Sequence, residues 1–263
     1  FGSSARGASG CGPKPMPDHA WAVPGAAVAA AAAALGLTLW LSRRTRRAVT
    51  LFLDCDDTLY RDGWQIAKAL SANMNDYCLS IGLPDLYCRK LFFEYGTCLR
   101  GLQKEGRIRE AEVEAFLERV HRLPLMGEAI KPDPRLRALL QDLRADTWIF
   151  TAASREHCAN CLEHLAVSDV IRHPIIDVRA VDFQTKKELG AYTKAMQLAG
   201  QSDPALCILV DDSPGNLKTA KAAGWRTVLC GTRDRNGALV DTSHADVVVE
   251  SVEELRSAVS ELF

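Results

Sequence analysis

Three aspartates lie within four positions directly behind an apolar run in the segment LFLDCDDTLY, residues 51–60. Carboxylates this close repel one another and raise each other's pKa unless a cation or a reaction partner offsets their charge. A second acidic pair, Asp211 and Asp212, also ends an apolar run. Hard oxygen ligands with room left for water and phosphate suit Mg²⁺, so we expect Mg²⁺ as the cofactor.

The same residues could transfer a phosphoryl group. A carboxylate can attack phosphorus and form an aspartyl phosphate, which water then hydrolyses. Such a reaction also needs an acid/base and positive groups around the transferring oxygens. The sequence offers a candidate for each role: Asp54 as nucleophile, Asp56 as acid/base, Thr151 as a hydrogen-bond partner of phosphate and Lys186 as its counter-charge.

Five apolar, β-rich runs predict the strands that must position these side chains. They cover residues 48–54, 147–152, 205–212, 225–231 and 246–250. Nearly continuous apolar character indicates strands buried on both faces, as in a parallel sheet with helices on each side. Helices are predicted between them, for example at 187–199 and 216–223. The expected fold class is α/β, a doubly wound parallel sheet.

The carboxyl ends of the strands in such a sheet form one crevice, where distant parts of the chain can meet. Asp54 and Thr151 end two of the predicted strands, and the pair at 211–212 ends a third. Alternation along the chain should let Asp54 and Asp56 face the same way. We therefore expect both carboxylates to meet a third one, from Asp211 or Asp212, in this crevice.

The gap between the first two predicted strands exceeds ninety residues, far more than a crossover needs. Within it, apolar residues recur at helical spacing in three sets: Ile66, Leu70, Tyr77 and Ile81; Leu91, Tyr95, Leu99 and Leu102; Val113, Phe116, Leu117 and Val120. These sets predict an all-helical cap at residues 61–130. The catalytic core would then comprise 48–60 and 131–263, and its first helix after the cap should begin at Asp133-Pro134.

The order of these motifs resembles the haloacid dehalogenase superfamily over the whole of residues 48–263. The matching motifs are D-C-D-D-T at 54–58, a strand-end threonine at 151, a lysine before a helix at 186 and V-D-D-S-P-G-N at 210–216. The resemblance implies the same roles for Asp54 and Asp56. It also implies that Mg²⁺ binds Asp54, the backbone carbonyl of Asp56 and Asp212, with Asp211 acting through a water molecule.

The lysine motif departs from the family pattern K-P-x-x-x-x-Y. A tyrosine six residues on, Tyr192, favours Lys186, but Lys187 stands where the family has proline. The choice between the two lysines therefore stays open at this point. A second departure is Thr151-Ala152-Ala153, where the family branch described next commonly has Thr-Asn-Ala.

The segments YGTCLRGL (95–102), RLPL (122–125) and KPDPRLRALL (131–140) resemble the pyrimidine 5′-nucleotidase-like branch, which carries a helical cap. This resemblance implies a phosphomonoester hydrolase acting on a pyrimidine nucleoside 5′-monophosphate or a similar small phosphorylated metabolite. We expect Tyr95, Thr97 and Arg100 of the cap, with Ala152, to contact substrate. The alternative for the cap residues is a solvated helix face.

Two other functions stay open. A phosphotransferase or phosphosugar mutase of the same fold would use the same four motifs. A membrane-tethered, catalytically inactive binding homologue is also consistent with the altered motifs at 151–153 and 186–187. An enzyme that removes halide from carbon is disfavoured, because that chemistry has no use for Asp56 or for the second acidic pair.

The N-terminal part has a different composition. Residues 1–19 are rich in Gly, Ser, Ala and Pro, and we expect them to be disordered or part of a targeting signal. No charged residue occurs from 20 to 42, and four arginines follow at 43–47. Residues 20–47 therefore predict either a membrane anchor, with the catalytic domain on the cytoplasmic side, or a plastid or mitochondrial targeting segment that is removed.

Overall composition excludes some partners. Among 263 residues, 48% are hydrophobic and 25% charged, and the net charge is −1 without a basic stripe, so we expect no nucleic-acid partner. Nine scattered cysteines indicate a reducing compartment rather than a disulfide scaffold.

A possible zinc site was also considered. Its residues have ligand-like spacing but share one predicted helix, without a second ligand pair: His157, Cys158, Cys161 and His164. We interpret them as helix or core residues. The sequence does not determine the oligomeric state.

Overall fold

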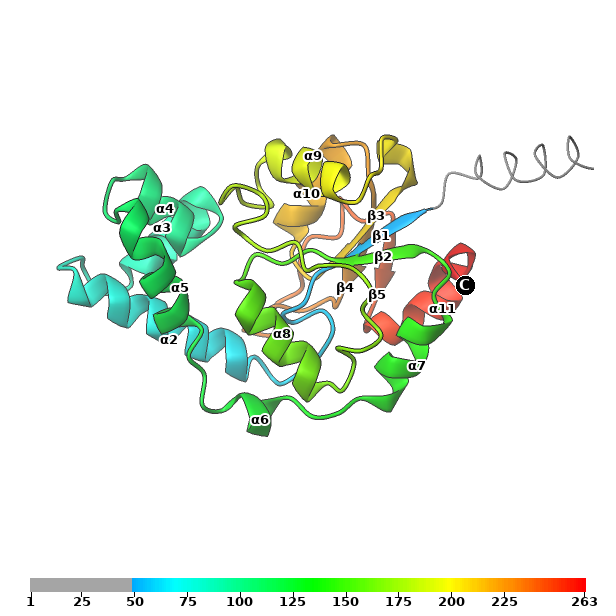
Figure 1. The fold of residues 1–263 in the computed structure, drawn as a ribbon, viewed down its shortest axis with the longest axis horizontal. Helices are drawn as coiled ribbons and strands as arrows, with labels where there is room; N and C mark the ends of the chain where they lie inside the picture. Colours follow the sequence, from blue (N-terminus) through cyan, green and yellow to red (C-terminus); the bar gives the residue numbers. More distant parts are fainter. Residues whose placement is uncertain (1–48) are drawn as a thin grey trace, which may run out of the picture. The chain divides into compact units, whose positions relative to one another are not determined.

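The five apolar runs form one parallel β-sheet in the computed structural model, which describes residues 49–263 (Figure 1). The strands are β1 (Thr50–Leu53), β2 (Asp146–Ile149), β3 (Cys207–Asp211), β4 (Arg226–Cys230) and β5 (Val247–Val249). They lie in the order β2-β1-β3-β4-β5, and each neighbouring pair is parallel. The predicted α/β class is confirmed. Since β1 lies between β2 and β3, the carboxyl ends of these three strands are adjacent.

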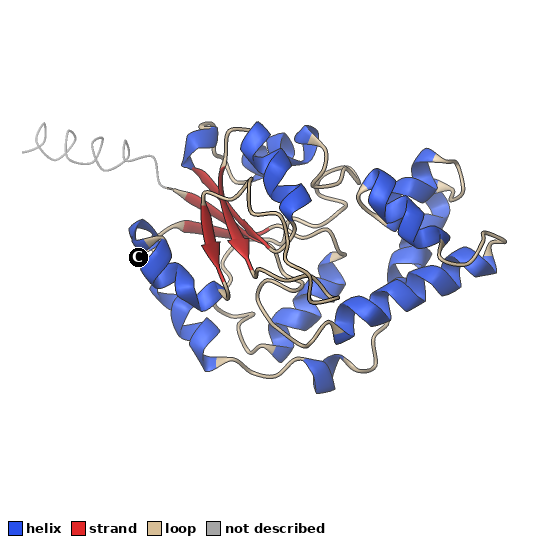
Figure 2. Ribbon diagram, turned by 180° about the vertical axis from the view of Figure 1, so that it is seen from behind, coloured by secondary structure: helices blue, strands red, loops and turns tan. Residues whose placement is uncertain are grey.

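Helices cover both faces of the sheet (Figure 2). Leu51 and Leu53 of β1 point into one buried cluster, under α7 (Pro134–Asp142), α8 (Arg155–His164) and α11 (Leu255–Ala258). Phe52 points into the other, under α9 (Leu189–Leu198) and α10 (Pro214–Ala222). Because the side chains of β1 alternate between two apolar layers, the sequence of the strand is apolar throughout. The predicted N-cap of α7 is also present, because the Asp133 side chain accepts hydrogen bonds from the N–H groups of Arg135 and Leu136.

Four helices and a short turn of helix occupy the long gap between β1 and α7. They are α2 (Gln65–Ser80), α3 (Tyr87–Tyr95), α4 (Cys98–Lys104), α5 (Val113–Val120) and α6 (Met126–Ala129). Residues 65–120, here called the helical insertion, have a buried cluster of their own, drawn from all four longer helices. The start of α2, at Ile66, and residues 123–130 pack instead into the cluster under the sheet. Short 3₁₀ segments complete the described chain at 110–112, 204–206, 252–254 and 260–262.

The periodic set from Leu91 to Leu102 falls on two helices, not one. Gly96 ends α3 with φ +91°, a conformation that costs glycine little. Thr97 then caps α4 by accepting a hydrogen bond from the N–H of Arg100. A β-carbon at Gly96 would lie only 2.7 Å from Thr185 Oγ1. The helical insertion is therefore close to the segment before α9 at the point where α3 ends.

Residues 1–48 lie outside the described part of the chain. The predictions of a disordered or targeting segment at 1–19 and of a membrane or transit segment at 20–47 therefore concern residues that the structure does not describe. Within 49–263, no helix has the length and apolar character required to span a bilayer.

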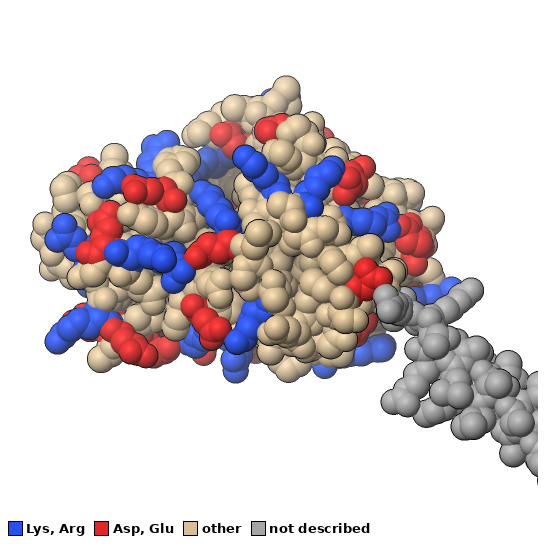
Figure 3. Space-filling model, turned by 90° about the horizontal axis from the view of Figure 1, so that it is seen from above, with Lys and Arg blue, Asp and Glu red and all other residues tan. Residues whose placement is uncertain are grey.

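The eight cysteines of residues 49–263 are all buried and form no disulfide. On the face seen in Figure 3, Lys and Arg side chains lie among Asp and Glu side chains and form no continuous basic stripe.

Candidate active site

The carboxyl ends of β1 and β3 bring two carboxylates to one buried lysine. Lys186 Nζ lies 2.6 Å from Asp54 Oδ1 and 2.8 Å from Asp211 Oδ2. All three side chains are at most 10% exposed. Burial opposes the charge of the lysine, but Asp211 and Asp54 outweigh it and raise the Lys186 pKa above its ordinary value. The lysine is therefore a fixed positive charge beside Asp54.

Asp212 adds a third carboxylate to this cluster. One carboxylate oxygen from each of Asp54, Asp211 and Asp212 lies within 4.8 Å of the others. Burial, with Asp211 and Asp54 nearby, raises the Asp212 pKa well above its ordinary value. Burial also raises the pKa of Asp54 to about 7, although Lys186 opposes this. One lysine does not offset three carboxylates, and this set of hard oxygen donors fits Mg²⁺.

Asp56 faces different partners from Asp54. Its Oδ1 accepts hydrogen bonds from the Tyr60 hydroxyl, at 2.6 Å, and from His157 Nε2, at 2.8 Å. The sequence predicted that the Asp54 and Asp56 side chains face the same way. The hydrogen bonds between β1 and β3, however, end with the one from Asp54 N–H to the Val210 carbonyl. A turn follows, with Asp57 at φ +57°. Because the extended conformation stops there, its alternation no longer sets the direction of Asp56.

The structure separates the two candidate lysines. Lys187 Nζ turns toward the helical insertion, where it donates to the carbonyl oxygens of Phe93, at 3.0 Å, and Phe92, at 3.4 Å. The Tyr192 hydroxyl lies 2.9 Å from the Lys186 carbonyl and 2.7 Å from that of Asn216. Tyr192 thus supports the backbone of Lys186, and the lysine at the carboxylates is Lys186.

A pocket beside Lys186 joins the core to the helical insertion. It is lined by Phe150, Thr151 and Ala152 after β2, by Thr97 and Leu99 of the insertion, and by six residues between 178 and 186. Three residues predicted to contact phosphate or substrate therefore share its wall: Thr97, Thr151 and Ala152. Thr151 is buried, and its hydroxyl accepts a hydrogen bond from the N–H of Ala153.

Two other predicted substrate residues do not line this pocket. Arg100 forms a bidentate ion pair with Glu188, with distances of 2.6 and 3.1 Å. Tyr95 contributes its backbone carbonyl, which accepts a hydrogen bond from Thr185 Oγ1. In this structure both residues connect the insertion to the segment before α9.

Sequence reasoning missed the residues around Asp56. His157 is fully buried and interpreted above as a helix residue, and its ring packs 4.8 Å from that of His121. Burial opposes its protonation, but the Asp56 carboxylate raises the His157 pKa to about 10. Burial likewise opposes ionisation of Asp56, yet His157 and Tyr60 hold the Asp56 pKa below its ordinary value. Tyr60 lies only four residues after Asp56. His157, in contrast, lies 101 positions from Asp56, so no local sequence pattern indicates their contact.

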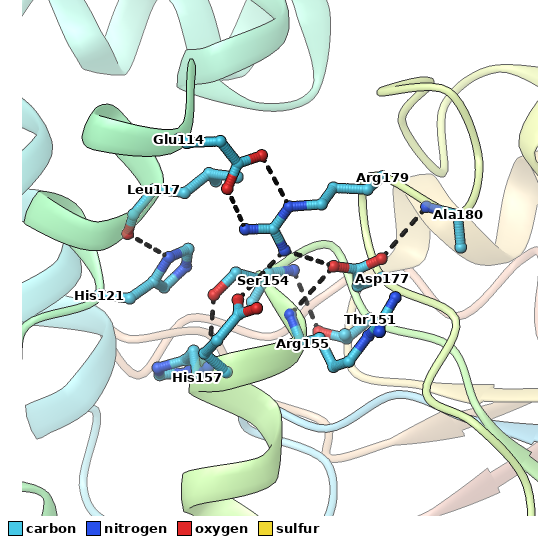
Figure 4. A network of polar contacts seen from close by, with 12 residues as sticks. Glu114, Leu117, His121, Thr151, Ser154, Arg155, His157, Asp177, Arg179 and Ala180 are labelled. Carbon is cyan, nitrogen blue, oxygen red and sulfur yellow. Dashed lines mark hydrogen bonds and ion pairs between the residues drawn. The ribbon is translucent and has the colours of Figure 1, made fainter. Parts of the chain in front are cut away.

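Arg179 joins the helical insertion to the core near the same place (Figure 4). Its guanidinium contacts Glu114 of α5 at 2.7 and 2.9 Å, and Asp177 of the core at 2.7 Å. Asp177 is fully buried and also accepts hydrogen bonds from the N–H groups of Arg155 and Ala180. Arg179 Nη1 also lies 3.1 Å from Glu156, the residue directly before His157 on α8.

Comparisons with known proteins agree with this arrangement. A family model for haloacid dehalogenase-like hydrolases matches residues 49–224, more than half of the chain. CbbY from Rhodobacter sphaeroides in complex with phosphate is similar at 20% identity and a TM-score of 0.56, over 79% of this chain and 96% of that one. β-Phosphoglucomutase from Clostridium difficile (17%, 0.54, over 79% and 93%) and L-2-haloacid dehalogenase from Xanthobacter autotrophicus (15%, 0.53, over 82% and 100%) are also similar. At these identities the likeness shows the fold alone.

Proposed function

The chain belongs to the haloacid dehalogenase-like hydrolases, and we propose that it is a Mg²⁺-dependent phosphomonoester hydrolase that forms an aspartyl phosphate on Asp54. The observation that carries the proposal is the cluster at the sheet edge, where Asp54 lies 2.6 Å from Lys186 and beside Asp211 and Asp212. A carboxylate nucleophile next to a fixed positive charge is what phosphoryl transfer requires.

The reaction proceeds in two displacements. In the first, an Asp54 oxygen forms a bond to phosphorus, the bond from phosphorus to the ester oxygen breaks, and Asp56, whose protonation the negative charge of the bound ester favours, gives that oxygen a proton. In the second, Asp56 takes a proton from water, the water oxygen attacks phosphorus, and the bond to Asp54 breaks. Lys186 and Thr151 hydrogen-bond the phosphoryl oxygens throughout. Asp56 ends in its starting state, and inorganic phosphate leaves.

Asp54, Asp212 and the backbone carbonyl of Asp56 would hold Mg²⁺, with Asp211 acting through a water molecule. The ion would neutralise charge on the phosphoryl oxygens. The raised pKa values of Asp54 and Asp212 support a cation at this place, because they reflect negative charge that Lys186 alone does not offset. Asp211 has a further structural role, since its Oδ1 accepts from Ser213 N–H and Asn216 Nδ2 at the start of α10.

As substrate we propose a small phosphomonoester, with a pyrimidine nucleoside 5′-monophosphate as the first compound to test. The lining of the pocket beside Lys186 supports this class, not its size, because its volume of about 10 Å³ holds about one water molecule. Its lining combines polar side chains, among them Thr151 and Lys186, with apolar ones, among them Leu99 and Val178.

Halide removal is not supported, although several similar structures are dehalogenases. That chemistry would leave Asp211, Asp212 and the hydrogen-bonded Asp56 without a role. A phosphosugar mutase or phosphotransferase remains a second candidate, because β-phosphoglucomutase shares the fold. It would pass the phosphoryl group from Asp54 to a sugar hydroxyl. Measuring phosphate release with and without an acceptor sugar distinguishes the two.

The proposal is tested with the full chain, Mg²⁺ and a panel of nucleoside monophosphates, sugar phosphates and an aryl phosphate. We expect Mg²⁺-dependent phosphate release from at least one ester. Asp54→Asn should lower turnover at least about 1,000-fold, since it removes the nucleophile. Asp57→Asn is the matched control: asparagine tolerates φ +57°, so this variant should keep most of the turnover.

Two results would contradict the proposal. A folded protein that cleaves no ester in the panel would favour the inactive binding homologue. Asp54→Asn protein with full turnover, in turn, would exclude the covalent route even if the chain is a phosphatase.

A further inference from the structure

Two cysteine thiols of the helical insertion are in contact. Cys78, in the last turn of α2, has its Sγ 3.8 Å from Sγ of Cys98, the first residue of α4. Their exposed fractions are 0% and 1%, and both belong to the buried cluster of the insertion. Because they lie on different helices, a bond between them would link α2 to α4.

A shared metal ion is the first alternative for two neighbouring thiols. A structural zinc site uses four ligands. Among residues 49–263, however, no further Cys, His, Asp or Glu completes a group of three ligand atoms within 4.8 Å of one another around this pair. Cys88, another thiol of the same cluster, contacts the Asn75 side chain and the Ser71 carbonyl instead. The arrangement therefore suits a reaction between two thiols better than a metal site.

We propose that Cys78 and Cys98 form a reversible disulfide that links α2 to α4 and displaces the pocket residues on either side of Cys98. The oxidant is a small disulfide such as oxidised glutathione. The Cys78 thiolate sulfur bonds to one glutathione sulfur, the bond between the two glutathione sulfurs breaks, and one glutathione thiolate leaves. The Cys98 sulfur then bonds to the Cys78 sulfur and releases the second glutathione. Two protein thiols are oxidised, one glutathione disulfide is reduced, and the two glutathione thiolates take up the two protons.

The surroundings of the pair favour Cys78 as the attacking thiol. The S–H of Cys98 donates to the Cys78 sulfur and lowers the pKa of Cys78 below its ordinary value, although burial opposes this. Both residues also lie at helix ends, which open at a lower cost than helix centres. Leu79 and Ile81, next to Cys78 in the sequence, are 47% and 39% exposed. A local opening at the end of α2 would therefore admit a small oxidant.

Cys98 stands between two residues of the pocket beside Lys186. Thr97 and Leu99 both line this pocket, and Thr97 also caps α4. The sulfurs of a disulfide are about 2 Å apart, so Cys78 and Cys98 must approach by about 1.8 Å from their present 3.8 Å. A displacement of about 1 Å at an active site can lower its rate about 100-fold. Building on the proposed hydrolysis, the oxidised form should therefore turn over more slowly.

The experiment uses the full chain equilibrated with oxidised or reduced glutathione, then denatured and alkylated with iodoacetamide. Mass spectrometry should show two fewer alkylated cysteines in the oxidised wild type, no bound glutathione, and a cross-linked peptide that contains Cys78 and Cys98. Dithiothreitol should reverse all three results. Cys98→Ala should instead retain glutathione on Cys78. Cys88→Ala is the matched control, because Cys88 lies in the same cluster but hydrogen-bonds to neither thiol.

Phosphate release from an ester that the reduced protein cleaves is then measured for both forms. Oxidation should lower kcat/KM several-fold for the wild type and Cys88→Ala, but not for Cys78→Ala, which lacks the attacking thiol. A wild type that keeps every thiol, or stops at the mixed disulfide with glutathione, would overturn the disulfide. A disulfide that leaves kcat/KM unchanged would overturn its link to the pocket.

Two further results stay interpretable. If the alanine variants do not fold, as judged by circular dichroism, the cross-linked peptide of the wild type decides the disulfide, and the kcat/KM of its two forms decides the link to the pocket. Reduced protein that cleaves no ester would overturn the proposed hydrolysis and the effect on turnover with it, while the count of alkylated cysteines would still decide the disulfide.

Discussion

Lys186 is the residue on which the candidate site is centred. Its ammonium group contacts Asp54 and Asp211 from two neighbouring strands, whereas the adjacent Lys187 contacts backbone carbonyls of α3. Lys186 and Lys187 are the central residues of a turn closed by the hydrogen bond from Glu188 N–H to the Thr185 carbonyl, and their side chains leave the turn toward different partners. The proline that the family has at position 187 would lack the contact to the insertion.

Replacing each lysine by methionine tests this assignment. Lys186→Met leaves Asp54 and Asp211 without their cation and should lower turnover at least about 100-fold, as removal of a charge-stabilising group does. Lys187→Met removes only hydrogen bonds to the Phe92 and Phe93 carbonyls and should keep most of the turnover. Steady-state phosphate release measures both. A larger loss for Lys187→Met than for Lys186→Met would reverse the assignment.

At the scale of elements, α8 connects the sheet edge to the helical insertion. Its start follows Thr151, its first turn carries His157, and Arg179 joins the loop beside it to α5 (Figure 4). The two carboxylates that Arg179 contacts differ in solvent exposure. Asp177 is fully buried, while the Glu114 side chain is 66% exposed. The core end should therefore contribute more to stability than the insertion end.

Arg179→Ala should lower the free energy of unfolding by about 2 kcal/mol, because it leaves the buried Asp177 charge with backbone donors alone. Glu114→Gln should cost no more than about 1 kcal/mol, because the exposed pair is screened by water. Urea denaturation of the two variants and the wild type provides the comparison. Equal costs would show that burial of Asp177 does not determine the strength of the bridge.

At the scale of the whole molecule, the parallel sheet collects negative charge at one edge and stabilises it only in part. Asp54, Asp211 and Asp212 meet there because β1 and β3 are neighbours and both strands end at the same level. Mg²⁺ bound to this cluster would interact mainly with the folded chain, since the unfolded chain separates Asp54 from the pair Asp211 and Asp212. Binding should therefore stabilise the whole fold.

The size of this stabilisation should depend on pH. The pKa of Asp54 is about 7 without metal, so below pH 7 its carboxyl holds a proton that Mg²⁺ must displace. The affinity should weaken as pH falls, by about tenfold per pH unit for each carboxyl that takes up a proton, and Asp212, whose pKa is also raised, adds to the effect of Asp54. Thermal unfolding with and without Mg²⁺ at pH 5.5 to 8 should show a shift in Tm that grows with pH. Asp212→Asn should remove most of the shift; a shift independent of pH would place the ion away from Asp54.

The sequence by itself determined the sheet and the edge at which Asp54 meets the acidic pair at 211–212. Continuous apolar runs predict strands buried on both faces, and the carboxyl ends of parallel strands must share an edge, so Asp54, Thr151 and Asp211 could be brought together without coordinates. The N-cap at Asp133 was equally local. These predictions succeed because each depends on the residues of one element or on a rule common to all parallel sheets.

Only the tertiary structure decided which lysine meets the carboxylates, what holds Asp56 and where Arg100 binds. Asp56 lies beyond the end of the strand, in a turn where alternation no longer applies, and its partner His157 is 101 positions away on α8. Arg100 finds Glu188 across 88 positions. Contacts of this kind depend on how separate elements pack, and no pattern within a single element records them.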